Sequence, residues 1–503
     1  MSVFSADEYP LIELYTSILS TNPFSSGWRQ ALRRLLDNEY VDSGFNDSLT
    51  LQRLNLDPNL ELLKDRLAAM MRRIRSRINS GSLFETHEVP QYVDLLNLHL
   101  LLRYAGSFLK LIHASQQPGV TEPVKVDWYP DYVRALEQGL KLLPGPRPRW
   151  MVPDHLIACH FQWFRSFYFL KTYIQGNSSL SLRLRQQLWN ALLGHNLRRY
   201  LRMFYRAVPM LNLLLQGEQG TGKQHVAQLL SCCRYIHFEP NEQRFHSLAW
   251  GLFRKINLPL QEIQHSMKSP LNEESLAQLP PYTTLYLQRV DQISPAFAAV
   301  CSQALYELLN RNELDFSAKS PLTAGRIKLI SSISQPFEEL VERDCDFREL
   351  LINLSNDFIR IPSLCERIDG KREELQNFVF RIVWHELGDE EAYPLTTEVM
   401  EVIEKELGFD YPWPGNFEEL RSCIYRIIMR RHYEGLRSIG RNTLERAIMN
   451  GELSADEIVS YYTTAMYDQV QNYQEVARRL HIDRRTVKSK INYELYQRFN
   501  PDE

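Results

Sequence analysis

The chain has 503 residues, of which 44% are hydrophobic and 24% charged, and its 58 basic and 61 acidic side chains give a net charge of −3. At roughly 150 residues per domain, this length corresponds to about three domains, each able to bury its own core. The composition excludes a small disulfide-stapled scaffold, a collagen-like repeat and a wholly disordered chain. The near balance of charge excludes a general attraction to nucleic acid or to anionic membranes, so any contact with nucleic acid must be local.

Cysteine usage and the N-terminus both indicate a cytoplasmic location. The seven cysteines include no C-x-x-C pair, so neither a disulfide framework nor a metal cluster is expected. Residues 1–8 have neither a basic region nor an apolar core, which argues against a secretory signal. The best membrane candidate, residues 93–113, carries polar and charged residues at helical intervals, which favours an amphipathic core helix over a membrane span. We therefore expect no membrane partner.

Residues 1–150 are expected to form a helical N-terminal region, because apolar residues recur in it at helical spacing. One such stripe consists of Leu60, Leu63, Leu67, Met70 and Ile74. An arginine cluster near its end is interpreted as the solvated face of a helix: Arg72, Arg73, Arg75 and Arg77. Proline-rich breaks at 117–119 and 143–148 end helices and predict a domain boundary near residue 150. No phosphoacceptor, metal or haem cluster is visible in this region.

The first motif that carries chemistry lies at residues 213–224. The pattern predicts an apolar strand over 213–216, a glycine-rich turn, and an amphipathic helix over 224–230. It fits G-x-x-x-x-G-K, in which backbone N–H groups converge on phosphate oxygens, the helix N-terminus adds its dipole and the lysine reaches the terminal phosphates. The predicted nucleotide-binding residues are Gly217, Glu218, Gln219, Gly220, Thr221, Gly222, Lys223 and Gln224. The motif usually ends in Ser or Thr, whose hydroxyl holds Mg²⁺, but here it ends in Gln224.

Three segments together resemble the AAA+ domain of bacterial enhancer-binding proteins, the sigma-54 activators. The first is G-E-x-G-T-G-K without a final Ser or Thr. The second, R-I-P-S-L-C-E-R at 360–367, is similar to the family's R-L-P-P-L-R-E-R at the start of the helical lid. The third, Y-P-W-P-G-N-F-E-E-L at 411–420, is similar to Y-P-W-P-G-N-V-R-E-L. The resemblance covers residues 174–435 and implies an α/β P-loop fold with a helical lid.

The chain departs from this family at the groups that hydrolyse ATP. The family's T-L-F-L-D-E supplies an Asp that holds Mg²⁺ and a Glu that polarises the attacking water. Here the motif reads T-L-Y-L-Q-R, with Gln288 and Arg289 at those two positions. Asp291 is not expected to take over the role of the Glu, because it lies two residues further along the chain. Ser334 stands where the family's polar sensor, A-A-T-N, has its Asn.

The arginines of the family are also partly lost. F-R-x-D-L-Y-Y-R-L reads F-R-E-L-L-I-N-L, so Arg348 is a candidate arginine finger and Asn353 replaces the second. Glu418 replaces the sensor arginine of the lid, and a carboxylate there should weaken ATP binding. Since each lost group typically supplies several kcal/mol of barrier lowering, no catalytic residue and no metal ligand is predicted, and the region is interpreted as a pseudo-ATPase. ATP or ADP is the candidate cofactor, and Mg²⁺ is doubtful.

The loop G-A-F-T-G-A, through which the family contacts sigma-54, has no counterpart between residues 248 and 281. A sigma-54-independent mode of action is therefore expected.

The C-terminus carries a predicted helix-turn-helix, with helices over 473–480 and 484–491 and a turn between them. It resembles the Fis-type DNA-binding region that ends enhancer-binding proteins, N-x-x-x-A-A-x-x-L-G-I-S-R-x-T-L-x-x-K-L, except that His481 stands where Gly is usual. Six basic and two acidic side chains make this segment locally positive. The residues predicted to face inward are Val476, Ala477, Leu480, Ile482, Val487 and Ile491. The predicted DNA-binding residues are Arg478, Arg479, Arg484, Arg485, Thr486, Lys488, Ser489 and Lys490.

These features predict a multidomain chain. Its parts are a helical N-terminal region (1–150), an AAA+ α/β nucleotide-binding subdomain with a leading linker (151–365), a helical lid (366–440) and an all-α Fis-type helix-turn-helix (455–503). The predicted function is sequence-specific transcription regulation. The expected partners are double-stranded DNA and further copies of the chain in a dimer or ring, with RNA polymerase holoenzyme as a candidate.

Two alternatives to this function stay open. One is an active ATPase that remodels a sigma-54 or other client complex. The other is a non-catalytic interaction partner of an active paralogue.

Overall fold

The computed structural model describes residues 2–41, 56–117, 119–208, 211–246, 252–260, 279–280, 282–313, 327–388, 390–436, 447–448, 451 and 453–499. The chain divides into two compact units, one formed by Met1–Met400 with Asn416–Arg421 and the other by Glu401–Gly415 with Ser422–Glu503. No division falls near residue 150, where the proline-rich breaks predict one. The physical reason is a hydrophobic core shared by the two sides of that position.

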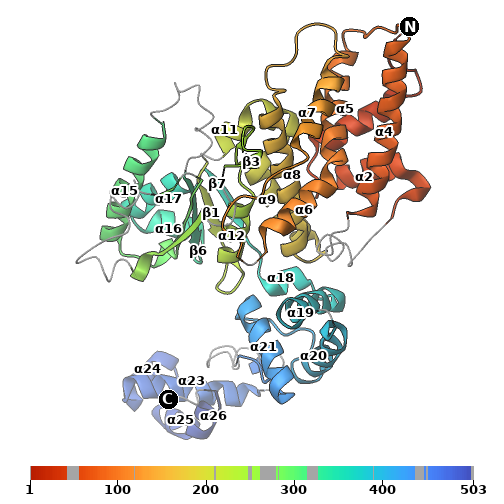
Figure 1. Ribbon diagram of the computed structural model, residues 1–503. Coiled ribbons are helices and arrows are strands. Elements are labelled where there is room, and N and C mark those ends of the chain that lie inside the picture. Colours follow the sequence, from red (N-terminus) through yellow and green to blue (C-terminus); the bar gives the residue numbers. More distant parts are fainter. Residues whose placement is uncertain are drawn as a thin grey trace. The chain divides into compact units, whose positions relative to one another are not determined.

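The N-terminal part of the first unit is helical, as predicted (Figure 1). Its helices are α1 (Tyr9–Ser20), α2 (Ser26–Leu36), η1 (Asp37–Glu39), α4 (Pro58–Asn79), α5 (Glu88–Arg103), α6 (Ala105–Ser115), α7 (Tyr129–Leu140), α8 (Pro153–Tyr173), α9 (Ser179–Leu193), α10 (Leu197–Arg199), η3 (Tyr200–Phe204) and α11 (Tyr205–Ala207). The predicted apolar stripe of α4 is buried throughout. In the arginine cluster beside it, Arg72, Arg73 and Arg75 are exposed, as predicted, and Arg77 is half-buried. Arg73 and Arg77 form ion pairs with the buried Glu8.

The apolar stretch 93–113 forms two buried helices and not one. Helices α5 and α6 meet at Tyr104 and are bent by 46°. Within the described ranges, no single helix is long and apolar enough to cross a membrane, and this bent pair passes such a test by length and composition only.

A five-stranded parallel sheet lies at the centre of the P-loop region, with the strand order β4-β5-β6-β1-β7. Its strands are β1 (Leu213–Gln216), β4 (Phe253–Asn257), β5 (Thr284–Gln288), β6 (Lys328–Ile333) and β7 (Asp357–Arg360). A separate antiparallel hairpin consists of β2 (Phe238–Glu239) and β3 (Arg244–Phe245). Because neighbouring strands are parallel, the segments that follow β1, β5 and β6 meet at one edge of the sheet. This architecture is consistent with an AAA+ α/β domain.

Two hydrophobic cores cover the two faces of this sheet. Alternate residues of β1 point to opposite faces, so that Leu213 and Leu215 join one core and Leu214 joins the other. The first core runs without interruption from Val3 in the N-terminal region to Ile361 after β7. The second is closed by helices of the P-loop region. The helices of this region are α12 (Lys223–Cys232), η6 (Val290–Gln292), α15 (Pro295–Glu313), α16 (Phe337–Arg343) and α17 (Cys345–Leu354).

The remaining elements are helical. The predicted lid contains α18 (Leu364–Ile368), α19 (Arg372–Leu387), α20 (Ala392–Glu406) and α21 (Asn416–Arg430), and the C-terminus contains α23 (Ala455–Val470), α24 (Tyr473–Leu480), α25 (Arg484–Lys490) and α26 (Tyr493–Phe499). All seven cysteines are free thiols, and five of them are buried.

Candidate functional site

The glycine-rich turn joins β1 to α12, as the sequence predicts. Gly220 and Gly222 have φ of 78° and 89°, a left-handed conformation that favours glycine. Gly217 is needed for a different reason: a Cβ atom there would lie 2.8 Å from the carbonyl oxygen of Ile361. The chain therefore turns tightly at the end of β1 and presents the N-terminus of a ten-residue helix, the arrangement that binds phosphate through backbone N–H groups.

Lys223 lies inside this turn. Its ammonium group donates hydrogen bonds to the carbonyl oxygens of Gly217 and Glu218, the latter at 2.8 Å, and to Ser334 Oγ at 3.2 Å. Burial lowers the pKa of Lys223, while the carboxylates of Asp291 and Glu418 act in the opposite direction. The structure thus brings the predicted P-loop lysine and the predicted sensor serine together at the carboxyl edge of the sheet.

The first residue of α21 is fixed directly to the P-loop. Asn416, fully buried, donates from Nδ2 to Glu218 Oε2 at 3.1 Å and to the carbonyl oxygen of Gln219 at 2.9 Å. Its Oδ1 accepts a hydrogen bond of 2.7 Å from the backbone N–H of Leu364. The backbone N–H of Phe417 also donates to the carbonyl oxygen of Gly220, at 3.1 Å. Asn416 lies in the W-P-G-N motif but was absent from the predicted site, because the motif does not reveal this partner.

The positions that would ligate Mg²⁺ do not fit a metal ion. Gln224 stands in place of the usual hydroxyl and accepts a hydrogen bond of 3.0 Å from the ammonium group of Lys255, which extends from β4. At the end of β5, Gln288 stands in place of the metal-holding carboxylate, and Arg289 follows it in a left-handed conformation with φ of 61°. The ammonium group of Lys255 thus contacts the side chain at the position expected to hold Mg²⁺. The neutral amides of Gln224 and Gln288 stand in place of the usual oxygen ligands of the metal.

Asp291 is engaged in holding the backbone. Its Oδ2 accepts hydrogen bonds from the backbone N–H groups of Ser334 at 2.9 Å and Gln335 at 3.1 Å. The side chain is 2% exposed, and within the described residues Oδ1 has no hydrogen-bond partner. Asp291 therefore connects η6 to the segment that follows β6.

The remaining predicted groups of this region lie at the surface. Glu418 is exposed in the first turn of α21, close enough to influence the pKa of Lys223. Arg348 is exposed on α17 and donates a hydrogen bond of 3.2 Å to the carbonyl oxygen of Val341. Of the stretch 248–281, compared above with G-A-F-T-G-A, residues 248–251, 261–278 and 281 lie outside the described residues.

The C-terminal helices form at the predicted positions. Asn472 caps α24 and Asp483 caps α25, each accepting hydrogen bonds from two backbone N–H groups. Between them His481 takes a left-handed conformation with φ of 55°, which explains why glycine is usual there. Of the residues predicted to face inward, Val476 and Val487 are fully buried and the other four are partly exposed.

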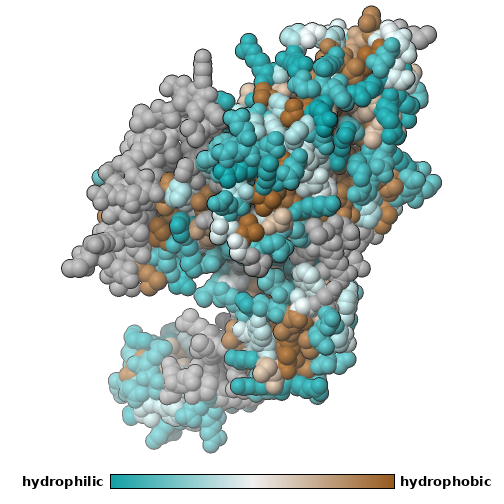
Figure 2. Space-filling view, viewed as in Figure 1, coloured by the Kyte–Doolittle hydropathy of each residue, from teal (hydrophilic) through white to brown (hydrophobic). Residues whose placement is uncertain are grey.

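The basic residues of this segment differ in how far they are already paired. Glu475 accepts hydrogen bonds from Arg478 and Arg479, and Lys490 pairs with Asp456. Over the part of the chain that the structure describes, three exposed basic side chains of α25 form no ion pair: Arg484, Arg485 and Lys488. The visible surface over α24 and α25 is mainly hydrophilic (Figure 2). The predicted interface therefore has its unpaired charge at the start of the second helix.

Comparison with known proteins gives a partial match. No family model matches the chain. Over 220 residues, 42% of the chain, it is 25% identical to the Nif-specific regulatory protein of Azotobacter vinelandii, of which 39% is covered. Over 229 residues, 41% of the chain, it is 24% identical to the phenol regulator MopR of Acinetobacter guillouiae, of which 38% is covered. The chain thus spans about two fifths of the length of these relatives.

Among solved structures, NtrX from Brucella abortus in complex with ATP aligns with 72% of the chain and 81% of its own length, at 16% identity and a TM-score of 0.34. The sequence similarities support, for the matched segment, the enhancer-binding class of regulators that the motifs indicate.

Proposed function

We propose that this protein is a sequence-specific DNA-binding transcription regulator of the enhancer-binding type, whose P-loop binds ATP or ADP without hydrolysing it. The similarity to two regulators supports the class. The absence of hydrolysis is inferred from the residues at the end of β5. Gln288 and Arg289 stand where the family has its acidic pair, and Asp291, the nearest carboxylate, is bonded to the backbone after β6.

Nucleotide binding in this proposal does not need Mg²⁺. The P-loop supplies its glycine turn, its helix N-terminus and Lys223, and Lys255 and Arg289 supply further positive charge. The carboxylate of Glu218 accepts a hydrogen bond from Asn416, so it already has a partner within the protein. Exposed Glu418 opposes phosphate binding, which leads us to expect a moderate affinity.

DNA binding rests on the start of α25. In a helix-turn-helix the N-terminal residues of the second helix reach base edges in the major groove, and the flanking cations contact phosphate. Arg484, Arg485 and Lys488 are exposed at this place. The sequence assigns Arg478 and Arg479 to the same interface. Because both donate hydrogen bonds to Glu475, they must give up that partner before they contact phosphate, and they are expected to contribute less to DNA affinity.

The nucleotide part is tested by measuring phosphate release from ATP together with binding of a fluorescent ATP analogue, with Mg²⁺ and with EDTA. We expect no release above a protein-free blank and a change in affinity smaller than about twofold when Mg²⁺ is removed. Hydrolysis that disappears in Lys223→Ala would contradict the proposal and support the active-ATPase alternative.

The DNA part is tested by mapping the occupied sites at base resolution and titrating one of them with the purified chain at several salt concentrations. Arg484→Ala with Arg485→Ala should lower the affinity at least 100-fold and reduce the slope of log K against log salt by about 2. Arg72→Ala with Arg75→Ala, which removes the same charge from exposed positions of α4, is the control and should bind as the wild type does. Undiminished affinity in the α25 variant would contradict a helix-turn-helix interface.

A further inference from the structure

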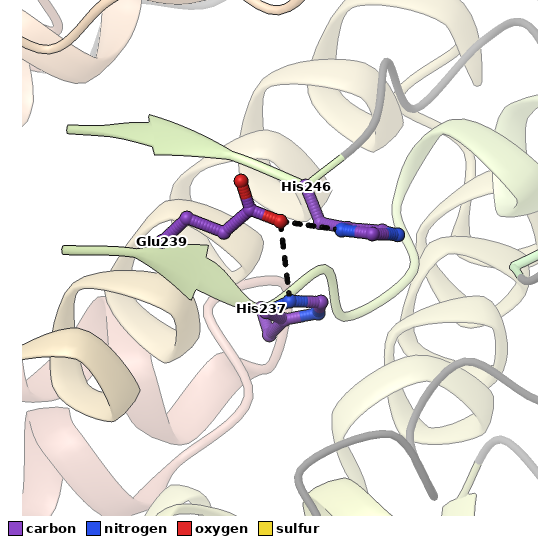
Figure 3. A group of neighbouring side chains, drawn as sticks. All are labelled: His237, Glu239 and His246. Carbon is purple, nitrogen blue, oxygen red and sulfur yellow. Dashed lines mark hydrogen bonds and ion pairs between the residues drawn. The ribbon is translucent and has the colours of Figure 1, made fainter. Parts of the chain in front are cut away.

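The hairpin β2–β3 gathers two histidines and a glutamate on one of its faces. Because successive residues of a strand point to opposite sides, Phe238 and Phe245 share one face, and His237, Glu239 and His246 share the other. The phenylalanines are buried in the core that includes the N-terminal helices. Figure 3 shows the carboxylate of Glu239 pointing toward both imidazole rings. The packing of one face thus fixes the polar side chains of the other.

The three side chains are spaced as ligands of one small ion. Glu239 Oε1 lies 2.6 Å from His246 Nδ1 and 3.7 Å from His237 Nε2, and the two rings stack with centroids 4.4 Å apart. One donor atom from each residue can be chosen so that all lie within 4.8 Å of one another. In a tetrahedral zinc site with bonds of about 2.1 Å, the ligand atoms are separated by roughly 3.4 Å. The two observed separations, 2.6 Å and 3.7 Å, thus lie on either side of the distance between two ligands of one ion.

A tyrosine orients one of the rings. His237 Nδ1 is hydrogen-bonded to the hydroxyl of Tyr282, which leaves Nε2 facing Glu239. Metal-binding histidines almost always use their second ring nitrogen in such a bond, which fixes the orientation of the ring. Tyr282 is buried and lies two residues before the first residue of β5, so the site is connected to the strand that ends at Gln288.

A cavity of about 780 Å³ adjoins the site and is lined in part by His237 and Glu239. Three arginines also line it: Arg149, Arg202 and Arg206. The other group of three donor side chains found in the described residues, Asp344 to Asp346, contains no imidazole and lies at the capped start of α17. The hairpin cluster is therefore the one whose donor set, two imidazoles and a carboxylate, matches a transition metal.

We propose that His237, Glu239 and His246 bind one divalent transition-metal ion of the zinc class, with a further coordination position open to the adjoining cavity. This donor set is that of zinc sites with three protein ligands, which keep one position for water or another ligand. The site lies outside the P-loop, on the hairpin β2–β3.

The test uses the full chain, stripped with a chelator and titrated with Zn²⁺ against a competing indicator dye. We expect one Zn²⁺ per chain, with the affinity lowered at least 100-fold in His237→Gln and in His246→Gln and about tenfold in Tyr282→Phe. His432→Gln is the matched control, since it removes a histidine that also contacts two carboxylates, Glu406 and Glu434, but has no second imidazole. Far-UV circular dichroism checks that each variant is folded.

X-ray absorption of the wild-type protein at one equivalent of Zn²⁺ provides a test that needs no variant. Nitrogen and oxygen neighbours at about 2.0–2.1 Å are expected, without sulfur at about 2.3 Å. A sulfur shell would assign the ion to the exposed Cys345 or Cys365 and overturn the proposal. So would affinity that is unchanged in both histidine variants, or the absence of stoichiometric binding.

Discussion

The P-loop and the end of β5 lie at the same edge of one sheet, yet they match the motifs of the family that the sequence resembles to different degrees. The P-loop retains its left-handed glycines, its lysine and a lid asparagine bonded to it. At the end of β5, Gln288 and Arg289 stand where the resemblance leads us to expect an acidic pair, and Asp291 accepts hydrogen bonds from the backbone. The P-loop is also a packing element, because Gly217 lies against Ile361 and the start of α21 is hydrogen-bonded to the turn. The largest effects should therefore come from its anchors.

The largest expected effect is that of Asn416→Ala. It removes three hydrogen bonds, leaves the buried N–H of Leu364 without a partner and places alanine at φ of 52°. We expect the free energy of unfolding of the first unit to fall by about 4 kcal/mol. Urea unfolding followed by circular dichroism measures this. Asn416→Gly, which tolerates the backbone conformation, should recover about 1 kcal/mol of the loss; equal losses would show that the hydrogen bonds alone matter.

Asp291 tests whether the β5 end retains a structural role only. Asp291→Ala leaves two backbone N–H groups unpaired and should lower the free energy of unfolding by about 3 kcal/mol. Asp291→Asn keeps an oxygen acceptor and should cost less than about 1 kcal/mol. Neither variant should change phosphate release from ATP. Phosphate release by the wild type that disappears in Asp291→Asn, with stability preserved, would contradict the proposed absence of hydrolysis, make Asp291 catalytic and remove the contrast with the P-loop.

Lys223→Met tests the phosphate-binding role of the P-loop. The ammonium group contacts the carbonyl oxygens of the turn, so its loss should lower nucleotide affinity about 100-fold, or about 2.7 kcal/mol. Lys223→Arg keeps the charge, and its nucleotide affinity should lie between those of the wild type and Lys223→Met. Binding of the fluorescent analogue in EDTA is the measurement, and an affinity equal to that of the wild type would place the nucleotide elsewhere.

The smallest effect is expected for Lys255→Ala, which removes the cation beside Gln224. Affinity in EDTA should fall about tenfold, or about 1.4 kcal/mol, if this ammonium group takes over part of the role of Mg²⁺. Arg254→Ala, an exposed cation one residue earlier on β4, is the control and should have no effect. Equal losses in both variants would indicate a general effect of charge.

Much of the local structure follows from the sequence. The strand over 213–216 and the helix over 473–480 have their predicted bounds, and the second C-terminal helix ends one residue earlier than predicted. These elements are set by nearby residues: glycines at the turn, and Asn472 and Asp483 as caps. The motifs name Lys223 and Ser334 separately, and the structure brings the two side chains within hydrogen-bond distance.

What the sequence could not predict depends on contacts between distant segments. The bond from Asn416 to Gln219 joins residues 197 positions apart, and no local pattern encodes it. The break between α5 and α6 at Tyr104 lies within a continuous apolar stretch that predicts one helix. The histidine cluster had a weak local signal, H-x-E followed by a histidine seven residues later. Its meaning became clear only once the hairpin had paired His237 with His246.

The core that runs from Val3 to Ile361 has a consequence for how this chain can be divided into fragments. A receiver attached by a linker can be deleted or exchanged between proteins, leaving the effector intact. Here a cut near residue 150 would separate α6 from α8 and expose Phe161 and Phe164, which pack against Phe108, to water. The N-terminal helices and the P-loop region are therefore expected to unfold in a single cooperative step and to be stable only when both are present.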